Sequence, residues 1–312
     1  MIKIIDNIII GSGPAGYSAA IYLARSNIKH ILYTGDLPGG QLINTNIIEN
    51  YPGFSKGILG IKLMKEMSKQ AIKFGSIIKY NTIIKVIFSK LKNNLHILYT
   101  NNKKKIFTKT IIIATGSIPK KLNIKYENNY LGYGISYCAI CDGIFYKNKN
   151  VAIIGGGNLA LENSIYLSKI CNKIYLIVRN NKLKASKNLQ NIIFKIKNII
   201  ILFNYEIKKI YGKKIIKYII LINNINLIKK KLKISGIFIS IGSIPNTLIF
   251  KNKIKMDNNG YIITNNKSTN TNIPGIFAAG DVQDSKYKQA ITSAGSGCMA
   301  ALDVENYLLN YK

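Results

Sequence analysis

Two cysteines separated by two residues, Cys138 and Cys141, are the side chains of this sequence best suited to chemistry, and Asp142 follows them directly. A two-residue spacer lets two thiols close into a disulfide and favours a reactive thiolate at neutral pH. Asp142 could shuttle a proton as the dithiol forms and breaks. A pair of buried structural cysteines is the simpler alternative. The spacing favours a redox-active pair.

The remaining cysteines and the histidines bear on whether a metal or disulfides hold this chain together. Four cysteines are too few for a secreted fold stapled by disulfides. A structural zinc needs four ligands, and His30 and His96 lie far from the cysteine pair without paired spacing. Cys171 and Cys298 have apolar and small neighbours in expected helices, so we expect core residues. No metal site is predicted, and in a reducing compartment a lone C-x-x-C is typical of redox chemistry.

A glycine-rich motif, G-x-G-x-x-G at residues 11–16, directly follows an apolar strand and precedes a run of helix formers. Glycines there let the backbone turn tightly and approach a pyrophosphate at the helix N-terminus. The acidic residue usually found about 20 residues further on, which would bind a ribose, is missing. Asp36 comes slightly late for that role. The motif therefore predicts a dinucleotide site without saying which dinucleotide binds.

A second motif, G-x-G-x-x-A at residues 155–160, again stands between a strand and a helix. The next strand runs into Arg179, with Lys184 shortly after. A basic residue, where an acidic one would bind a free 2′-hydroxyl, favours a 2′-phosphate and hence NADPH over NADH. Ordinary surface lysines in a lysine-rich chain are the alternative.

Asp281 lies at the end of an apolar strand, in the phrase IFAAGDV, shortly before the last expected helix. A carboxylate there can accept hydrogen bonds from a polyol such as the ribityl chain of a flavin. The positive end of the helix that begins near residues 289–291 could face the flavin pyrimidine, where negative charge develops on reduction. A simple helix-capping or turn role for Asp281 is the alternative.

The chain also contains a weak internal duplication. Each glycine motif begins a strand–loop–helix unit, and each half closes with a strand and the letters GSIP, at residues 111–120 and 238–246. This predicts an α/β fold of two Rossmann-like, doubly wound nucleotide-binding domains, with short antiparallel strands added to the sheets. The segment after residue 243 is too short for a third such domain. We therefore expect a discontinuous domain of residues 1–115 and 244–312, an inserted domain of residues 116–243, and a hinge at the two GSIP strands.

Charge and hydropathy limit the partners and the location. The 312 residues carry a net charge of +32, but arginine occurs only at positions 25 and 179 and the lysines are spread along the chain. Proteins that read duplexes favour arginine, so no nucleic-acid partner is expected, although acidic partners should be attracted at low salt. No apolar run approaches the roughly 20 residues needed to cross a bilayer. The first strand is interrupted by Asp6 and Asn7 and does not read as a signal peptide, so a cytoplasmic protein is expected.

Taken together, the motifs resemble those of the low-molecular-weight bacterial type of thioredoxin reductase, a flavoprotein disulfide reductase. The phrases that carry the resemblance span nearly the whole chain: GSGPAG (11–16), GGQL (39–42), ENYPGF (49–54), IIIATGS (111–117), SYCAICDG (136–143), GGGNLALE (155–162), IPGIFAAGDV (273–282) and QAITSAGSGCMAALD (289–303). The resemblance implies FAD in the discontinuous domain, and NADPH with the redox pair in the inserted one. It also implies a homodimer in which one domain rotates against the other.

The resemblance also assigns roles to single residues. Electrons would pass from NADPH through FAD to Cys141, Cys138 would attack the thioredoxin disulfide, and Asp142 would donate the proton. The positions assigned to FAD are Gly11, Gly13, Pro14, Ala15, Gly16, Gly40, Gln41, Asn50, Thr115, Gly280, Asp281, Gln289, Ala290 and Ile291. Those assigned to NADPH are Gly155, Gly157, Asn158, Ala160, Arg179 and Lys184.

The sequence departs from the family where the 2′-phosphate would bind. The family pattern reads roughly His-Arg-Arg-x-x-x-Arg, and here Arg179 is kept while Asn180 and Lys184 replace the other two arginines. Lysine binds phosphate as a point charge without the bidentate fork. Leu159 also replaces a frequent small hydroxyl residue. We expect NADPH to remain preferred, with weakened affinity. A related flavin reductase for another protein or small-molecule disulfide, or a non-catalytic flavin-binding remnant, are the rival readings.

Overall fold

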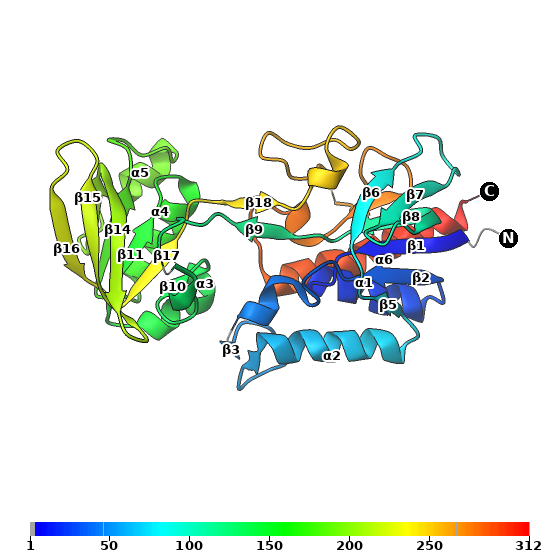
Figure 1. The fold of residues 1–312 in the computed structure, drawn as a ribbon, viewed down its shortest axis with the longest axis horizontal. Helices are drawn as coiled ribbons and strands as arrows, with labels where there is room; N and C mark the ends of the chain where they lie inside the picture. Colours follow the sequence, from blue (N-terminus) through cyan, green and yellow to red (C-terminus); the bar gives the residue numbers. More distant parts are fainter. Residues whose placement is uncertain (1–3, 46, 126, 266, 312) are drawn as a thin grey trace. The chain divides into compact units, whose positions relative to one another are not determined.

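The computed structural model describes residues 4–45, 47–125, 127–265 and 267–311. The chain divides into two compact units, the first made of Met1–Ile118 with Ile244–Lys312 and the second of Pro119–Ser243. The sequence placed the boundaries at 115/116 and 243/244, and the structure places them at 118/119 and 243/244. Figure 1 shows the two units and the two strands, β9 (Ser117–Pro119) and β18 (Ser243–Pro245), that lead from one to the other.

Unit 1 is built on a sheet with the order β5-β2-β1-β8-β7-β6, in which β19 also pairs with β8. Its strands are β1 (Ile4–Ile10), β2 (His30–Tyr33), β5 (Ile77–Lys79), β6 (Ile83–Ile87), β7 (His96–Thr100), β8 (Lys105–Ile113) and β19 (Ile276–Ala278). The strands β1, β2, β5, β8 and β19 pair in parallel, while β6 and β7 pair antiparallel. The prediction of antiparallel strands added to a parallel sheet is thus confirmed.

Strand β1 is apolar nearly throughout because both faces of the sheet are covered. Alternate residues point to opposite faces, so Ile9 packs in a core with the helices while Ile8 and Ile10 pack in a second core on the other side. The covering helices are α1 (Pro14–Arg25), α2 (Gly60–Lys73) and α6 (Ala290–Leu309). Short elements complete the unit: η1 (Gly40–Asn44), β3 (Ile47–Ile48), β4 (Ile58–Leu59), η4 (Leu248–Phe250) and η5 (Gly280–Val282).

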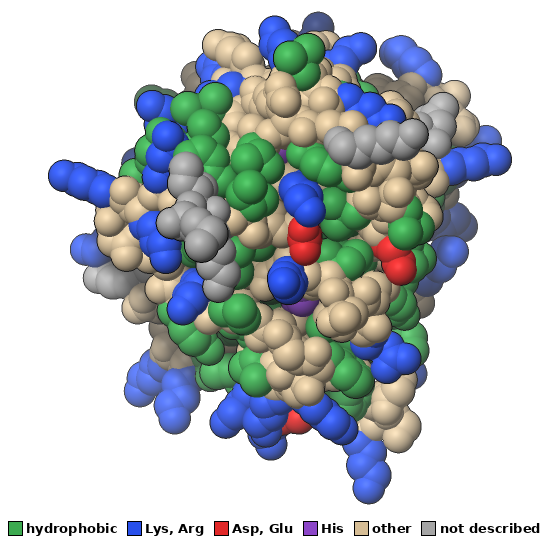
Figure 2. Space-filling view, turned by 90° about the vertical axis from the view of Figure 1, so that its right-hand side faces the viewer, with side chains coloured by type: hydrophobic (Ala, Val, Ile, Leu, Met, Phe, Trp, Pro, Cys, Tyr) green, Lys and Arg blue, Asp and Glu red, His purple; other side chains and the backbone are tan. Residues whose placement is uncertain are grey.

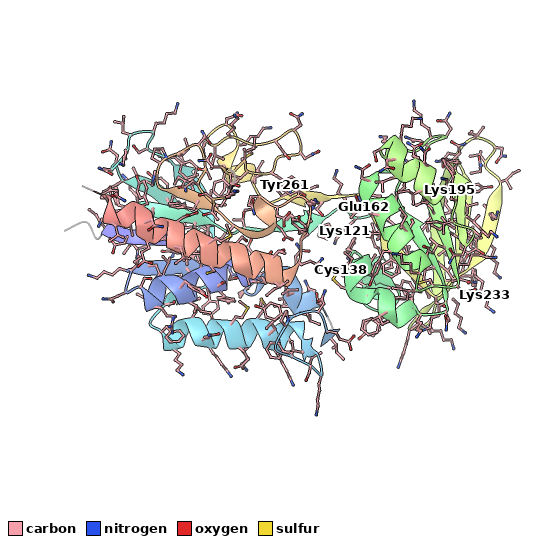
Figure 3. The ribbon with its side chains drawn as sticks, turned by 180° about the vertical axis from the view of Figure 1, so that it is seen from behind. Lys121, Cys138, Glu162, Lys195, Lys233 and Tyr261 are labelled. Carbon is pink, nitrogen blue, oxygen red and sulfur yellow. A yellow bond between two sulfur atoms is a disulfide. The ribbon has the colours of Figure 1, made fainter. Side chains whose placement is uncertain are left out.

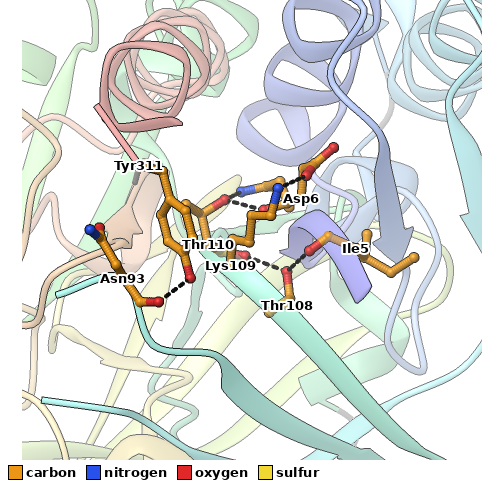
Figure 4. A network of polar contacts seen from close by, with 8 residues as sticks. Ile5, Asp6, Asn93, Thr108, Lys109, Thr110 and Tyr311 are labelled. Carbon is orange, nitrogen blue, oxygen red and sulfur yellow. Dashed lines mark hydrogen bonds and ion pairs between the residues drawn. The ribbon is translucent and has the colours of Figure 1, made fainter. Parts of the chain in front are cut away.

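The C-terminal end of the chain contacts the strands of unit 1 through a network of polar side chains, which Figure 4 shows. Lys109 of β8 forms a 2.8 Å ion pair with Asp6 of β1, and its ammonium group lies 5.6 Å from the centre of the Tyr311 ring. The Tyr311 hydroxyl in turn donates to the carbonyl of Asn93 at 2.6 Å. These contacts help to explain why residues after 243 return to complete the first unit.

Unit 2 has three layers. A parallel sheet with the order β10-β17-β11-β12-β13 lies between helices on one face and a three-stranded antiparallel sheet, β14-β15-β16, on the other. The strands are β10 (Ile135–Ser136), β11 (Asn150–Ile154), β12 (Lys173–Val178), β13 (Ile199–Phe203), β14 (Tyr205–Gly212), β15 (Ile216–Asn223), β16 (Lys229–Lys233) and β17 (Gly236–Ile239). The helices are η2 (Glu127–Tyr130), α3 (Ala139–Asp142), η3 (Gly143–Tyr146), α4 (Asn158–Ser168) and α5 (Lys187–Ile193). The predicted α/β class with two doubly wound nucleotide-binding folds is confirmed.

Surface charge and hydropathy follow the sequence. On the face of the molecule in Figure 2, lysine and arginine side chains are spread around the whole face. Among the described residues two ion pairs are formed, Lys69–Glu66 and Lys109–Asp6, so most of the lysines have no carboxylate close by. Within the same described part of the chain, every helix is too short or too polar to cross a bilayer.

Candidate active site

The two cysteines of the C-x-x-C motif are joined in the structure by a disulfide of 2.11 Å between their sulfur atoms. Cys138 is the N-cap residue of the short helix α3, and the N–H of Cys141 lies 3.1 Å from the Cys138 sulfur. Figure 3 shows Cys138 at the start of this helix. The short helix brings residue 141 back over residue 138, because one helical turn takes about 3.6 residues. This geometry allows the pair to exchange between disulfide and dithiol.

Asp142 is held next to the pair in a poorly solvated position. Burial raises the pKa of its carboxyl group, and a hydrogen bond from Ser136 partly offsets that rise. A carboxyl group that keeps its proton to higher pH is suited to donate it during thiol exchange. The nearby Tyr146 hydroxyl stays protonated, because burial, helped by the charge of Asp142, raises its pKa to about 12.

The other two cysteines differ from each other. Cys171 is buried, and this burial raises the pKa of its thiol to about 11, so it remains a neutral core side chain. Cys298 on α6 is only partly buried. The prediction that both are core residues therefore holds for Cys171 and is wrong for Cys298. The prediction for Cys298 relied on its small neighbours in the sequence. It failed because one face of α6 remains open to solvent.

The first glycine loop follows the carboxyl end of β1. Two of its glycines leave no room for a side chain, whereas a third does. Gly11 has φ +112°, and a Cβ there would lie 2.2 Å from the carbonyl oxygen of Ala114. At Gly16 a Cβ would lie 2.0 Å from the Gly11 oxygen. At Gly13, the N-cap of α1, no protein atom lies within 4 Å of such a Cβ, and no side chain caps the helix there. An open glycine before uncapped helix amides fits the phosphates of a dinucleotide.

Asp281 lies beside this loop. The preceding Gly280 packs so closely on Ala15 of α1 that a Cβ would lie 2.9 Å from the Ala15 Cβ. The Asp281 carboxylate accepts a 3.0 Å hydrogen bond from Ser293 of α6, and burial raises its pKa. Helix α6 is capped by Gln289, so the alternative of Asp281 as its N-cap is excluded. A half-buried carboxylate beside the glycine loop remains available to a polyol.

Among the other positions expected to bind FAD, Gly40 lies against the first glycine loop, while Asn50 and Gln289 contact each other. Gly40 has φ +64°, and a Cβ there would lie 3.3 Å from the Gly13 Cα. The Asn50 amide donates to the Gln289 side chain at 3.2 Å, which joins two segments far apart in the sequence. Asp36, the late acidic residue after β2, instead accepts a 2.5 Å hydrogen bond from Thr82.

The remaining predicted FAD positions lie near the segment between β8 and β9 or in the first turns of α1 and α6. Thr115 and Asn246 are paired by two 2.8 Å hydrogen bonds, one in each direction. The Gln41 amide donates to the carbonyl of Ser117. Ala290 and Ile291 form the first turn of α6, where Ile291 is 41% exposed. Pro14 is the first residue of α1, where its missing N–H costs no hydrogen bond.

The second glycine loop repeats this geometry in unit 2. Gly155 has φ +144°, and a Cβ there would lie 2.4 Å from the Ser240 oxygen, whereas a Cβ at Gly157 would have no protein atom within 4 Å. Gly157 is the N-cap of α4, and no side chain caps that helix at Gly157. Ala160 is fully buried, and its Cβ would lie 2.9 Å from a Cβ placed at Gly155. The open glycine again lies where a phosphate would meet helix amides.

The predicted 2′-phosphate residues lie next to this second loop. The backbone N–H of Lys184 donates to the Gly156 carbonyl at 2.7 Å, and Asn158 accepts from the N–H of Ser186 at 2.9 Å. Arg179 and Lys184 are both exposed. Leu159, in the place of the family's small hydroxyl residue, is 41% exposed at the start of α4. The loop therefore presents two cations to solvent and one apolar side chain in place of a phosphate donor.

Sequence reasoning missed two hydroxyl groups that contact the predicted site residues. Ser136 bonds the backbone of Cys138 and the carboxyl group of Asp142, and Ser293 bonds Asp281. Serine is too common for either to be found by type. The available signal was position, because Ser136 comes two residues before the cysteine pair and Ser293 lies in the first turn of α6.

Comparisons with known proteins agree with this geometry. Residues 5–297 match the family model described as pyridine nucleotide-disulphide oxidoreductase. The chain is 51% identical to the thioredoxin reductase of Buchnera aphidicola subsp. Schizaphis graminum over 96% of both chains. It is 46% identical to that of Rickettsia typhi over 96% of this chain and 97% of the relative. Among solved structures, the thioredoxin reductase from Giardia duodenalis matches with a TM-score of 0.93 at 31% identity, covering 98% of this chain and 99% of that one. The one from Streptococcus pyogenes MGAS5005 matches with a TM-score of 0.91 at 35% identity, over the same shares.

Proposed function

Because the chain belongs to the pyridine nucleotide-disulphide oxidoreductases, and within them to the thioredoxin reductases, we propose that it uses NADPH and FAD to reduce thioredoxin through Cys138 and Cys141. The observation that carries this proposal is the Cys138–Cys141 disulfide at the start of α3, beside the half-buried carboxyl group of Asp142. A structural disulfide needs no proton donor, whereas an exchanging one does.

Each unit has one glycine loop between a strand and an uncapped helix, and the two loops have matching geometry. We assign FAD to the loop at Gly13 with Asp281 beside it, and NADPH to the loop at Gly157 with Arg179 and Lys184. The open glycine positions and the uncapped starts of α1 and α4 support both assignments. When bound, the two cofactors supply the hydride and the electron pair that reduce the disulfide.

The cysteines then carry the electrons to the partner by two exchanges. The Cys138 thiolate attacks one sulfur of the partner disulfide, which forms a mixed disulfide and releases the other sulfur as a thiolate. That thiolate takes a proton, for which Asp142 is placed. The Cys141 thiolate next attacks the Cys138 sulfur, restores the Cys138–Cys141 disulfide and releases the partner's second thiolate, which is protonated in turn. The partner gains two electrons and two protons, and the pair loses the same.

Anaerobic titration of the purified protein with NADPH, and separately with NADH, tests the proposal through the flavin absorbance. We expect a yellow protein that NADPH bleaches and that then reduces added thioredoxin. A colourless protein that cannot be reconstituted with FAD would contradict the cofactor assignment. A protein that bleaches but reduces only a small-molecule or other protein disulfide would contradict the choice of thioredoxin.

We also propose a homodimer in the cytoplasm. Ile291, Met299 and Leu302 lie along one side of α6 and are 41%, 44% and 46% exposed, and Tyr22 of α1 is 42% exposed. A second copy of the chain would cover this apolar stripe and leave the lysines in water. The cysteines outside the pair, Cys171 and Cys298, are free thiols, as a reducing compartment would keep them. Sedimentation of Met299→Lys and Leu302→Lys variants, expected to be monomers, tests the assignment of this face.

A further inference from the structure

Glu127 is a buried carboxylate that neither the sequence motifs nor the proposed reaction uses. It begins the short helix η2, and only 5% of its surface is exposed. A buried carboxylate is costly to desolvate unless several donors satisfy it. Three groups donate hydrogen bonds to it: the backbone N–H of Leu122 at 3.1 Å, the N–H of Asn123 at 2.9 Å, and the hydroxyl of Tyr137 at 2.9 Å.

These donors come from two functionally different segments of unit 2. Leu122 and Asn123 follow closely on Pro119, the residue at which the chain enters unit 2. Just before them, the N–H of Lys120 donates to the carbonyl of Gly242 at 3.0 Å, so the incoming and outgoing connectors are bonded together. Figure 3 shows Lys121 at this end of the connector. Both oxygens of the Glu127 carboxylate therefore hold the entry segment, Oε1 through Leu122 and Oε2 through Asn123.

The third donor, Tyr137, directly precedes Cys138. Its ring packs against the apolar core between the two sheets of unit 2, and burial, helped by the nearby Glu127, raises the pKa of its hydroxyl, which therefore stays a donor. The strand before it, β10, is only two residues long, so it holds the chain by few ladder hydrogen bonds. The bond to Glu127 supplies an additional anchor immediately before the reactive sulfur.

We propose that Glu127 is a positioning residue for the redox pair: through Tyr137 it fixes the backbone before Cys138 to the segment by which the chain enters unit 2. The proposal rests on the redox role proposed for Cys138 and Cys141. A fixed backbone keeps the Cys138 sulfur within bonding reach of Cys141 when the disulfide is opened. It thereby raises the effective concentration of one thiol at the other and favours the disulfide. The pair and the connector then move as one body.

Tyr137→Phe is the sharpest test because it removes the bond to Glu127 and leaves the carboxylate paired with both backbone amides. Glu127→Gln turns one acceptor oxygen into a donor that faces an N–H. Tyr133→Phe is the matched control, since Tyr133 is four residues before Tyr137 and 59% exposed. The FAD-loaded protein is equilibrated in buffers of oxidised and reduced dithiothreitol. The free thiols are then alkylated and counted by intact mass. Cys171 and Cys298 add the same two thiols to the disulfide form and to the dithiol form.

We expect Tyr137→Phe and Glu127→Gln to shift the equilibrium between disulfide and dithiol toward the dithiol by about three- to tenfold, where tenfold corresponds to about 30 mV. Tyr133→Phe should leave it unchanged. Hydrogen exchange at the Leu122 and Asn123 amides should accelerate in Glu127→Gln but not in Tyr137→Phe. If Tyr137→Phe is folded and keeps the wild-type equilibrium, the proposal is overturned, whether or not Glu127→Gln folds. Failure of the wild type to reduce thioredoxin would instead overturn the proposed function, because the dithiothreitol equilibrium needs no thioredoxin.

Discussion

The Ser136 hydroxyl is hydrogen bonded to the backbone of Cys138 in both directions: it accepts from the Cys138 N–H at 3.0 Å and donates to the Cys138 carbonyl at 3.2 Å. The hydroxyl has a single proton, and when it donates that proton to the carboxyl group of Asp142 instead of the Cys138 carbonyl, it lowers the pKa of Asp142 against the rise caused by burial. One buried serine thus links the cysteine that would attack the partner with the group that would supply the proton.

Replacing this serine should change the pH dependence of the reaction. Ser136→Ala removes the bond that favours the charged carboxylate, so the pKa of Asp142 should rise further. If Asp142 acts as an acid, the loss of kcat on the alkaline side of the thioredoxin reduction profile should move to higher pH. Stability should fall by about 1 kcal/mol for the lost hydrogen bonds. Ser168→Ala, whose hydroxyl bonds the Ile165 carbonyl within α4, is the control, and an unshifted profile in Ser136→Ala would exclude the proton-donor role.

The separate roles of the two cysteines predict a variant in which NADPH still reduces the flavin but thioredoxin is not reduced. Cys138→Ser should still allow NADPH to reduce the bound flavin, because that hydride transfer comes before any step that uses Cys138. Reduction of thioredoxin should fall to background. Cys298→Ser, at the partly exposed cysteine of α6, should keep full activity. The measurement is flavin absorbance after one equivalent of NADPH, followed by thioredoxin turnover; a Cys138→Ser protein that holds FAD but is not bleached contradicts the route.

The two glycines of the first loop should respond oppositely to alanine. Gly11→Ala places a Cβ at 2.2 Å from the Ala114 oxygen with φ +112°, so we expect a loss of at least about 2 kcal/mol in unfolding free energy. Gly13→Ala meets no protein atom and should change stability by less than about 0.5 kcal/mol. It should nevertheless weaken FAD binding at least about tenfold, because the methyl group points to where the pyrophosphate would lie. Unchanged flavin affinity in Gly13→Ala would remove FAD from this loop.

Restoring an arginine should strengthen the choice of NADPH. The Asn180 side chain is exposed, and its carbonyl is already bonded to the N–H of Asn204, so Asn180→Arg leaves the backbone as it is. A bidentate guanidinium should raise the ratio of kcat/KM for NADPH over NADH by about tenfold, or about 1.4 kcal/mol. Asn181→Arg, one residue away from the family pattern, is the matched control. A wild-type protein that uses NADH as well as NADPH would contradict the starting preference.

Patterns that are local in sequence predicted the fold and the Cys138–Cys141 pair correctly. The C-x-x-C pair, both glycine loops and the antiparallel strands β6 and β7 follow from spacing and periodicity over a few residues. The α/β class followed from the repeated strand–loop–helix phrase. Each of these depends on backbone geometry that neighbouring residues determine.

What the sequence did not reveal depends on tertiary neighbours. Gly11 and Gly13 are equivalent in the motif. They differ in the structure because a Cβ at Gly11 would collide with the Ala114 carbonyl, whereas a Cβ at Gly13 would meet no protein atom. Glu127 and Tyr137 are ten residues apart without a recognisable motif, and they meet because η2 folds back against the end of β10. The exposure of Cys298 depends on which face of α6 meets α1, which small residues alone do not indicate.

A buried histidine should make stability depend on pH in the mildly acidic range. His96 is 1% exposed, its Nδ1 accepts from the Ser89 N–H at 3.1 Å, and its Nε2 has no hydrogen-bond partner within the part of the chain that the structure describes. Burial lowers its pKa to about 4, although the nearby Pro274 carbonyl opposes this. The unfolded chain, with a pKa near 6.5, binds a proton that the folded chain refuses.

The contribution of His96 to stability is therefore complete above pH 6.5 and is lost as the pH falls from about 6.5 to 4, by about 3 kcal/mol in all. Urea unfolding of the wild type and of His96→Gln across this range isolates it, since carboxylates titrate equally in both proteins. The glutamine can still accept from Ser89 but does not titrate, so its stability should fall less steeply below pH 6.5. Burial also lowers the pKa of His30, and His30→Gln should flatten the dependence in the same direction. Identical pH dependence in wild type and His96→Gln would show that His96 does not control acid stability.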